Sequence, residues 1–181
     1  TEFNLTYNKG QRVNVKVNKD RTFETDLQEP LTNARGMFQG MSYLETLDLN
    51  SLDTSQVTDM YDMFNQSIYL KDIKLNIDTS KVTDMSFMFL GCDGLETLDL
   101  SNFNTINLKS ARQMISFCSK LKTVDASNFD TRNLSDFHSM FCNCDELTTV
   151  YINIDFSKAY TDLDLFHSDY LLTNIVGRFS N

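Results

Sequence analysis

The chain has 181 residues, and its 16 Lys and Arg stand against 25 Asp and Glu, so the formal net charge is -9 at pH 7. This acidic balance argues against a phosphate-backbone partner, and we expect no nucleic acid to bind. No apolar run approaches the roughly 18 residues of a membrane span, so we expect no transmembrane segment in this fragment. Because the chain starts at Thr1 rather than Met, we interpret it as a fragment or processed form of a longer protein.

Residues 1–30 alternate apolar and polar side chains. The alternation is clear over residues 3–7 and 13–17, and Asn8-Lys9-Gly10 between them supplies a turn. We therefore predict a β-meander over residues 1–30. The end of a repeat array exposes an apolar edge, so we expect this meander to cap the first repeat. A separate binding module is the alternative interpretation.

From residue 31 onward the sequence repeats. Full repeats start at residues 44, 70, 95, 121 and 147, at intervals of 25 or 26 residues, after a half repeat at 31–43 and before a partial sixth that starts at 172. A fixed period in this range predicts a solenoid, here residues 31–181. We expect the array to continue in the parent protein, because Leu171, Leu172, Ile175 and Phe179 would otherwise leave an apolar edge uncovered.

Each full repeat changes its apolar spacing once. Residues 44–49 read Leu-x-x-Leu-x-Leu, which predicts a strand, whereas the apolar residues of 57–64 recur at helical spacing after Thr58, a candidate N-cap. The predicted fold class is therefore α/β. We expect a right-handed, leucine-rich-repeat-like solenoid with a parallel sheet on one face, short helices on the other and the N-terminal β-meander cap.

Two columns of the aligned repeats are predicted to fill the interior. The columns read Met37, Met63, Met88, Met114, Met140, Leu165 and Phe38, Phe64, Phe89, Ile115, Phe141, Phe166. Stacked Met and Phe at this spacing are typical of a core rather than of a cofactor site, and we expect no cofactor.

Three cysteines, Cys92, Cys118 and Cys144, share another column. Successive rungs of a parallel solenoid lie about 4.8 Å apart, so a disulfide between neighbours is geometrically possible. Ser67 occupies the same column, which favours a packing position with buried free thiols.

Two further clusters could be taken for metal sites. Cys142, Cys144 and His167 lack a fourth ligand, so a metal there is disfavoured. A column at the corner after each strand could be a calcium ladder, but Asp-rich β-rolls need Gly-rich turns and this chain has six Gly. The column consists of Asp53, Asp78, Asn104, Asp130 and Asp155. Side-chain bonds to turn amides explain it, and we predict no metal site.

The residues between the core positions of each strand should point outward in two rows. We predict that these rows bind a partner, and they contain Thr46, Asp72, Thr97, Thr123 and Thr149, and Asp48, Lys74, Asp99, Asp125 and Tyr151. Beside them, opposite charges at Glu45 and Lys71 and at Glu96 and Lys122 should pair across neighbouring strands. That pairing is also the alternative, purely structural role of the charges.

The string from Asp78 to Leu100 contains Asp-Thr-Ser-x-Val-Thr-Asp-Met-x-x-Met-Phe, then Gly-Cys-Asp-Gly-Leu and Leu-Glu-Thr-Leu-Asp-Leu. It resembles the roughly 25-residue repeat of BspA-like bacterial surface proteins, and the resemblance covers residues 31–176. This resemblance implies an extracellular, cell-surface location, an envelope-anchored parent protein and adhesion, with no shared catalytic residues.

We therefore expect a non-catalytic protein-binding or adhesion module that recognises a host or neighbouring-cell protein, or a glycan, through the exposed sheet face. A structural spacer that projects another domain from the cell envelope is the alternative. An enzyme would need a pocket between the cap and the first repeat, and the sequence contains no Gly-rich phosphate loop, His-Glu-x-x-His or Gly-x-Ser-x-Gly motif.

Overall fold

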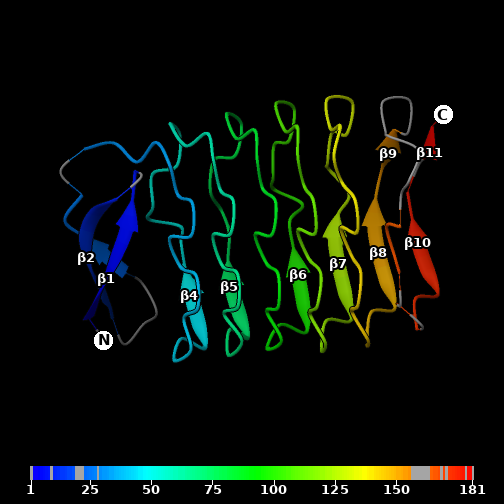
Figure 1. Cartoon of the computed structure of the whole chain (residues 1–181), viewed down its shortest axis with the longest axis horizontal. Coiled ribbons are helices and arrows are strands. Elements are labelled where there is room, and N and C mark those ends of the chain that lie inside the picture. The colour runs from blue at the N-terminus through cyan, green and yellow to red at the C-terminus, as the bar shows by residue number, and fades with distance from the viewer. Residues whose placement is uncertain are drawn as a thin grey trace.

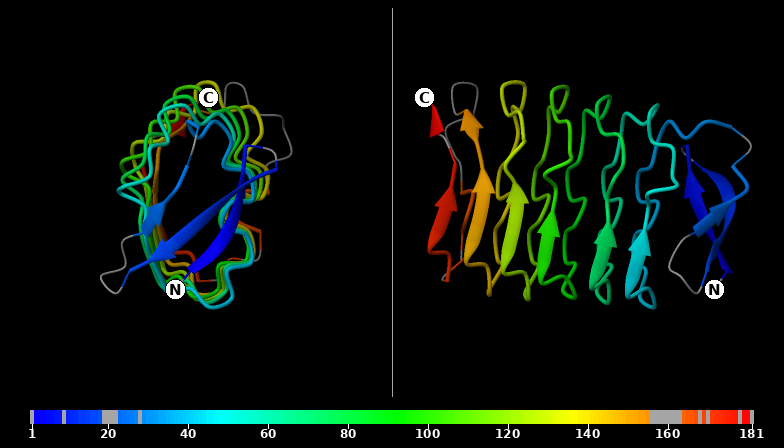
Figure 2. Two further views of the ribbon diagram at one scale, coloured as in Figure 1. Left: turned by 90° about the vertical axis from the view of Figure 1, so that its left-hand side faces the viewer. Right: turned by 180° about the vertical axis from the view of Figure 1, so that it is seen from behind.

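The computed structural model describes residues 2–8, 10–18, 23–27, 29–155, 164–167, 169, 171–177 and 179–180. The chain winds into a solenoid whose coils stack side by side along the long axis, with the N-terminus at one end and the C-terminus at the other (Figure 1). Seen along that axis, the coils superimpose as one closed outline (Figure 2). Each coil therefore contacts mainly its neighbours, as in other repeat proteins.

The N-terminal segment forms a three-stranded antiparallel sheet. Strand β1 (Glu2–Tyr7) pairs with β2 (Gln11–Val17), which pairs with β3 (Phe23–Thr25), so the predicted meander is confirmed. Leu5 and Val15 are buried in the same hydrophobic cluster as the coils. The meander and the first coil thus share one core.

One face of the solenoid carries a short strand from each coil. These strands are β4 (Thr46–Asp48), β5 (Asp72–Lys74), β6 (Thr97–Asp99), β7 (Thr123–Ala126), β8 (Thr149–Ile152) and β10 (Asn174–Val176). All their pairings are parallel and in register, so Leu47 lies beside Ile73, and Leu98 beside Val124. Among the described residues, however, β5 and β6 are not paired, and the face consists of a β4–β5 part and a β6–β7–β8–β10 part.

The last described coil continues this arrangement. Strand β9 (Ile154–Asp155) pairs in parallel with β11 (Phe179–Ser180), and β10 pairs with β8. The expected partial sixth repeat therefore starts with a strand. Residues 156–163 of the fifth predicted repeat lie outside the described residues.

The short helices expected on the opposite face do not form. The described part of the chain contains no helix, so the predicted α/β class was wrong and the molecule is a β-solenoid. The residues at helical spacing instead form consecutive tight turns. In the coil that contains residues 57–67, Met63 N donates to Met60 O at 3.2 Å and Ser67 N donates to Phe64 O at 3.0 Å.

Left-handed backbone explains why these turns cannot join into a helix. The third residue of each turn, Asp62 at φ 59° and Gln66 at φ 60°, has a positive φ, as a type II turn requires. Five successive coils repeat the pair of positive φ values four residues apart. The pairs are Gly36 and Gly40, Asp62 and Gln66, Phe87 and Gly91, Gln113 and Phe117, and Ser139 and Asn143.

Alternate amides of this turn face bond to the next coil. The four donors of one coil are Met60, Asp62, Phe64 and Gln66, and their acceptors are the carbonyls of Asp84, Ser86, Met88 and Leu90, at 2.9, 3.0, 2.8 and 2.7 Å. The amides in between bond within their own turn, or to an Asp side chain as Tyr61 N does to Asp59 Oδ1 at 2.9 Å. Thr58, predicted as a helix cap, instead donates its backbone amide to Thr32 O at 3.1 Å.

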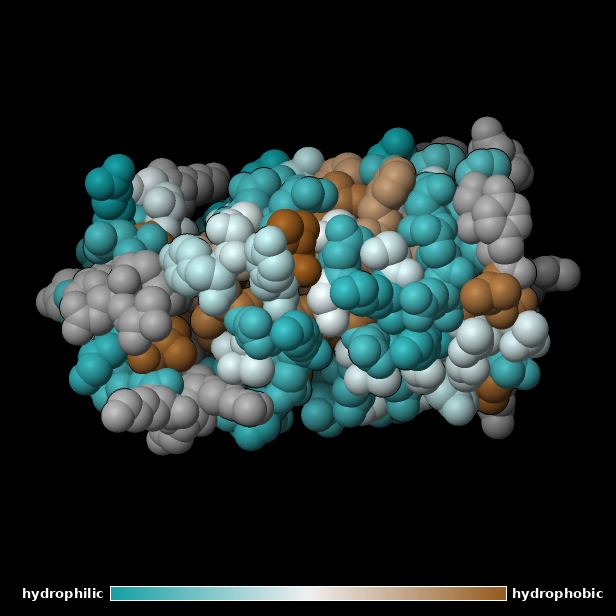
Figure 3. All heavy atoms as spheres, turned by 90° about the horizontal axis from the view of Figure 1, so that it is seen from below, coloured by the Kyte–Doolittle hydropathy of each residue, from teal (hydrophilic) through white to brown (hydrophobic). Residues whose placement is uncertain are grey.

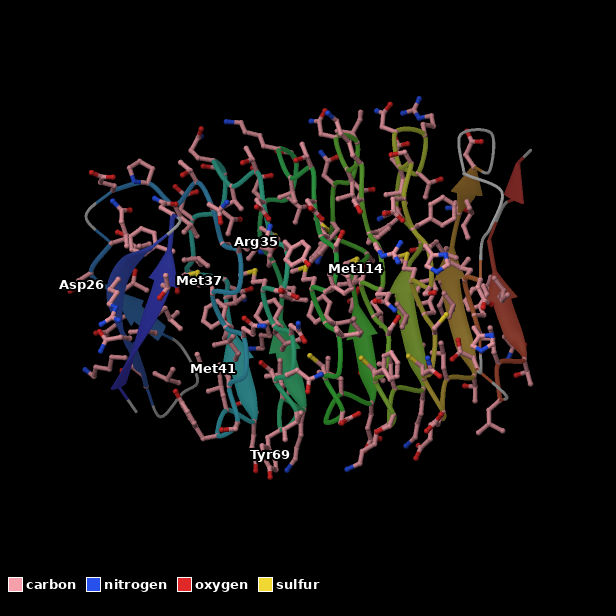
Figure 4. All side chains as sticks on the ribbon, viewed as in Figure 1. Asp26, Arg35, Met37, Met41, Tyr69 and Met114 are labelled. Carbon is pink, nitrogen blue, oxygen red and sulfur yellow. The ribbon has the colours of Figure 1, made fainter. Side chains whose placement is uncertain are left out.

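The Met and Phe columns fill the space between the two faces. Their described members up to Phe141 are buried, and Figure 4 shows Met37 and Met114 inside the stack while Tyr69 projects from its lower end. Phe64 stacks on Phe38 at 5.4 Å and on Phe89 at 5.2 Å between ring centroids. The predicted core is therefore confirmed.

Candidate functional site

The strand register lines up the residues predicted to bind a partner. Thr46 lies beside Asp72 and Asp48 beside Lys74 on β4 and β5. On β6 to β8 the two rows read Thr97, Thr123, Thr149 and Asp99, Asp125, Tyr151. The unpaired junction between β5 and β6 divides the ten residues of the two rows into two groups, which the sequence did not indicate.

Charges on the β4–β5 part neutralise one another. Lys71 Nζ lies 3.1 Å from Glu45 Oε2, and Lys74 Nζ lies 3.2 Å from Asp48 Oδ2. These are the cross-strand pairs predicted from the alternation of charge, and they support strand register. They leave this part of the face with few charges available to a partner.

The β6–β8 part keeps its acidic groups unneutralised in the two rows. Asp99 Oδ1 accepts bonds from Ser101 N at 2.9 Å and from Ser101 Oγ at 2.6 Å, and these bonds lower the pKa of Asp99. Asp125 Oδ1 accepts a bond from Ser127 N at 3.0 Å. Within the described ranges neither carboxylate forms an ion pair, and the hydrogen bonds from the turn residues hold both in place.

Lys122 lies beside this acidic part of the face. Lys122 Nζ lies 2.9 Å from Glu96 Oε2 and 3.9 Å from Glu146 Oε2, so its charge is shared between two carboxylates. The hydrogen bond to Lys122 lowers the pKa of Glu96. The predicted Glu96 and Lys122 pair is therefore confirmed, and it leaves the rows of Asp99 and Asp125 acidic.

Strand β10 extends the face beyond the predicted residues. Asn174 continues the row of Thr149, and Val176 continues the row of Tyr151. Tyr151 is 37% exposed and Val176 is 49% exposed, so the acidic part ends in a small apolar border. Sequence reasoning placed a strand at 172–175 but missed these two positions, because the fifth repeat loses its regular spacing and the register across it could not be counted.

The cysteine column is a packing position. All four cysteines are free and buried, as expected for Cys92, Cys118 and Cys144, and Cys92 Sγ donates to Phe64 O at 3.1 Å. Cys118 and Cys144 make the corresponding contacts with Phe89 O and Ile115 O, at 3.1 and 3.0 Å. Burial raises the pKa of Cys92 to about 12, so this thiol stays protonated and unreactive at neutral pH.

The Asp and Asn side chains of the corner column accept hydrogen bonds from turn amides, as predicted. The Oδ1 atoms of Asp53 and Asp78 accept the amides of Ser55 and Ser80 at 3.0 and 2.8 Å. Asn104 Oδ1 accepts the amide of Ile106, and Asp130 Oδ1 accepts the amide of Arg132. Asp130 Oδ2 also accepts a bond from the Arg132 guanidinium. His167 Nδ1 lies 2.9 Å from Asp164 Oδ2, and in the described residues no three His, Cys, Asp or Glu side chains gather as metal ligands would.

The underside of the solenoid, where the chain turns into the strands, mixes hydrophilic and hydrophobic residues rather than presenting one apolar patch (Figure 3). Within the described ranges, no helix could cross a bilayer. The structure thus defines a β-solenoid repeat domain with one flat strand face and one face of tight turns.

This chain belongs to the family described as "Mycoplasma protein of unknown function, DUF285", whose profile matches residues 32–154. The match begins in the half repeat and ends at β9, so it covers the solenoid and leaves the meander outside. No curated protein and no solved structure gives a significant match to the chain.

Proposed function

We propose that this domain is a non-catalytic binding module of a cell-surface protein, and that it recognises a partner protein through the β6–β8 part of its strand face. The observation that carries the proposal is the pair of oriented carboxylates, Asp99 and Asp125, in adjacent positions of one row without a cation. A row of threonines, Thr97 to Thr149, runs beside them.

The charge of this surface indicates the kind of partner. Like charges held next to each other on neighbouring strands repel, and a basic partner surface would relieve that repulsion. The exposed Tyr151 ring at the end of the row adds the amphipathic contact that protein interfaces favour. We therefore propose a basic protein surface of a host or neighbouring cell as the partner.

The proposed location rests on the resemblance of the repeats to those of BspA-like surface proteins. Protease treatment of intact cells that produce the parent protein tests it. We expect the domain to be cleaved from, or detected on, the intact cell surface, and protection until the cells are lysed would contradict a surface location.

The binding proposal is tested with Asp99→Asn combined with Asp125→Asn. Each amide keeps the Oδ1 acceptor for its turn, so the fold should be retained while two charges disappear. A small loss of stability is expected, because hydrogen bonds from Ser101 lower the pKa of Asp99 and so favour its charged form in the folded chain. We expect the double variant to lose most of its adhesion to epithelial cell monolayers and to immobilised extracellular-matrix protein.

Asp53→Asn combined with Asp78→Asn is the matched control, because it removes two charges from turn carboxylates at the corner rather than on the face. This control should adhere like the unmodified domain. Equal loss in both variants would indicate a non-specific effect of net charge, and an unmodified domain that binds neither surface would favour the spacer alternative.

A further inference from the structure

A groove lies at the edge of the turn face, away from the strand face. Its volume is about 690 Å³, and its lining includes Gln66, Gly91, Gln113, Phe117 and Asn143. This volume is within the range of small-molecule sites. The Gln66 side chain packs against Gly91, where a Cβ would lie 2.2 Å from the Gln66 side-chain nitrogen.

Phe117 is the unusual residue of this groove. It has a φ of 59° at a position where the other coils carry Gly40, Gln66, Gly91 and Asn143. A bulky aromatic residue is disfavoured in left-handed backbone, and burial does not compensate here because Phe117 is 50% exposed. Such outliers are often retained for function.

The backbone that carries this ring is hydrogen-bonded to the neighbouring coils. Phe117 N donates to Cys142 O at 2.9 Å, and the preceding coil is tied to the same strip through Gly91 N and Ser116 O at 2.9 Å. The ring is therefore an exposed apolar platform on a rigid part of the coil stack. It is also one of the few large apolar side chains that the described structure exposes by half or more.

Polar groups of complementary type surround the platform. Gln113 and Asn143 supply side-chain amides, and Asp93 and Asp145 supply carboxylates. Asp93 Oδ1 is oriented by bonds from Ser119 N at 3.1 Å and Ser119 Oγ at 2.8 Å. The described lining contains no Lys or Arg, so an anionic ligand would face only like charge and neutral amides.

We propose that this groove binds a neutral oligosaccharide. The Phe117 ring would pack against the C–H face of a sugar ring, while amides and carboxylates bond to its hydroxyls, a combination of apolar platform and few polar groups that suits this ligand class. The site lies on different residues from the partner-binding face and takes a different class of ligand, so it goes beyond the function proposed above.

The test is titration of the whole domain with lactose, maltotriose, triacetylchitotriose and, as an anionic comparison, sialyllactose, followed by calorimetry and saturation-transfer NMR. We expect at least one neutral sugar to bind and sialyllactose not to bind. Phe117→Gly should lose at least about tenfold in affinity, since a stacked ring is removed. Its melting temperature should stay the same or rise, because glycine accepts the left-handed backbone.

Phe87→Gly is the matched control. Phe87 also has a φ of 59°, but its ring packs edge-on against Tyr61 at 5.2 Å and does not line the groove. This variant, and Asp99→Asn with Asp125→Asn, should bind the sugar normally. The proposal is overturned if no neutral sugar binds at millimolar concentration, if sialyllactose alone binds, if Phe117→Gly keeps full affinity, or if only peptides bind in a Phe117-dependent way.

Discussion

The position shared by Ser67 and Cys92 shows how one hydrogen bond determines the choice of residue. Ser67 Oγ donates to Phe38 O at 2.8 Å, and Cys92 Sγ donates to Phe64 O at 3.1 Å one coil later. Both side chains are buried. In these coils the position therefore suits a small side chain with a donor, and thiol chemistry is incidental.

Substitution of Cys92 tests this explanation. Cys92→Ser keeps the donor and should cost little, whereas Cys92→Ala removes the bond, leaves a small cavity and should cost about 1–2 kcal/mol in the free energy of unfolding. Urea denaturation of both variants measures the difference. Equal losses of stability would show that the hydrogen bond is not what the position selects.

Asp169 occupies the same column one coil beyond Cys144 and is less well accommodated. Its Oδ1 accepts Cys144 N at 2.8 Å, but its Oδ2 is buried without a partner among the described residues. Burial, with a smaller contribution from the charge of Asp145, raises the pKa of Asp169 to about 6. The ionised carboxylate is therefore disfavoured in the folded chain.

This raised pKa predicts a pH dependence of stability. Because the folded pKa exceeds the ordinary value of 3.8, the stabilising contribution of the protonated group is complete below about pH 4 and is lost as pH rises through about 6. Asp169→Asn should remove this dependence and gain about 1–2 kcal/mol at pH 7, allowing for partial solvent screening. Denaturation at pH 4 and pH 7 measures it.

Asp78→Asn is the control with the opposite sign. Hydrogen bonds from Ser80 lower the pKa of Asp78, so its charged form is favoured in the folded chain and the substitution should lose stability at pH 7. A variant Asp169→Asn that is less stable than the unmodified chain at pH 7 would contradict the burial argument.

The turn face shows how far apolar spacing can predict an element. Residues 57–64 have helical spacing, and the prediction that Met60, Met63 and Phe64 point inward was correct. The prediction of a helix was wrong, because two type II turns also place these side chains on one side. Spacing identifies which residues share a face, and it does not identify the backbone that brings them there.

The two columns of left-handed residues held the signal that could have corrected the prediction. They contain Gly36, Gly40 and Gly91, as well as Asp62 and Asn143, and such residues tolerate positive φ and break helices. Phe87 and Phe117 in the same columns obscured the signal. These two exceptions are also where the structure departs most from what local sequence preference predicts.

The aromatic column offers a prediction at the scale of one element. Ile115 interrupts the stack between Phe89 and Phe141, and Phe141 stacks on Phe166 at 5.2 Å. Ile115→Phe should join the two stacks and stabilise the domain by about 1 kcal/mol, the typical value for aromatic pairs. Thermal denaturation measures it, with Phe64→Ile as the control that should destabilise by interrupting a stack. A large loss of stability from Ile115→Phe would show that the column has no room for the ring.

At the scale of the whole molecule, the meander and the coils form one cooperative unit because Asn8 joins them. Its Oδ1 accepts bonds from Thr32 N at 2.7 Å, Thr32 Oγ1 at 3.0 Å and Asn33 N at 2.9 Å, and its Nδ2 donates to Pro30 O at 3.0 Å. Its φ is 43°, which Asn tolerates better than most residues. The boundary predicted at residue 30 is thus crossed by a hydrogen-bonded junction.

Asn8→Ala should weaken this junction. The loss of four hydrogen bonds and the left-handed backbone should cost about 2–4 kcal/mol and speed amide exchange in β1 and β2 more than in β7 and β8. Asn8→Asp keeps the three accepted bonds and should lose less. Uniform exchange across all strands in Asn8→Ala would contradict a local role of Asn8.

The alignment of the two strand rows, which we propose bind a partner, could be predicted from the sequence because strand pairing in register follows directly from the repeat. The groove at Phe117 could not be predicted, because its shape depends on the left-handed turns at the edge of the coil. A helix over residues 109–117 would have placed the Phe117 ring elsewhere. The site that the sequence missed therefore arises from the same turns that the sequence failed to predict.

The central claim is that the turn face is held by hydrogen bonds between coils. Scalar coupling measured by NMR through the hydrogen bond from Phe64 N tests it most directly. We predict coupling to the carbonyl carbon of Met88, whose oxygen lies 2.8 Å from Phe64 N in the next coil. Coupling to the carbonyl of Met60, four residues earlier as in a helix, would contradict the β-solenoid and the sites derived from it.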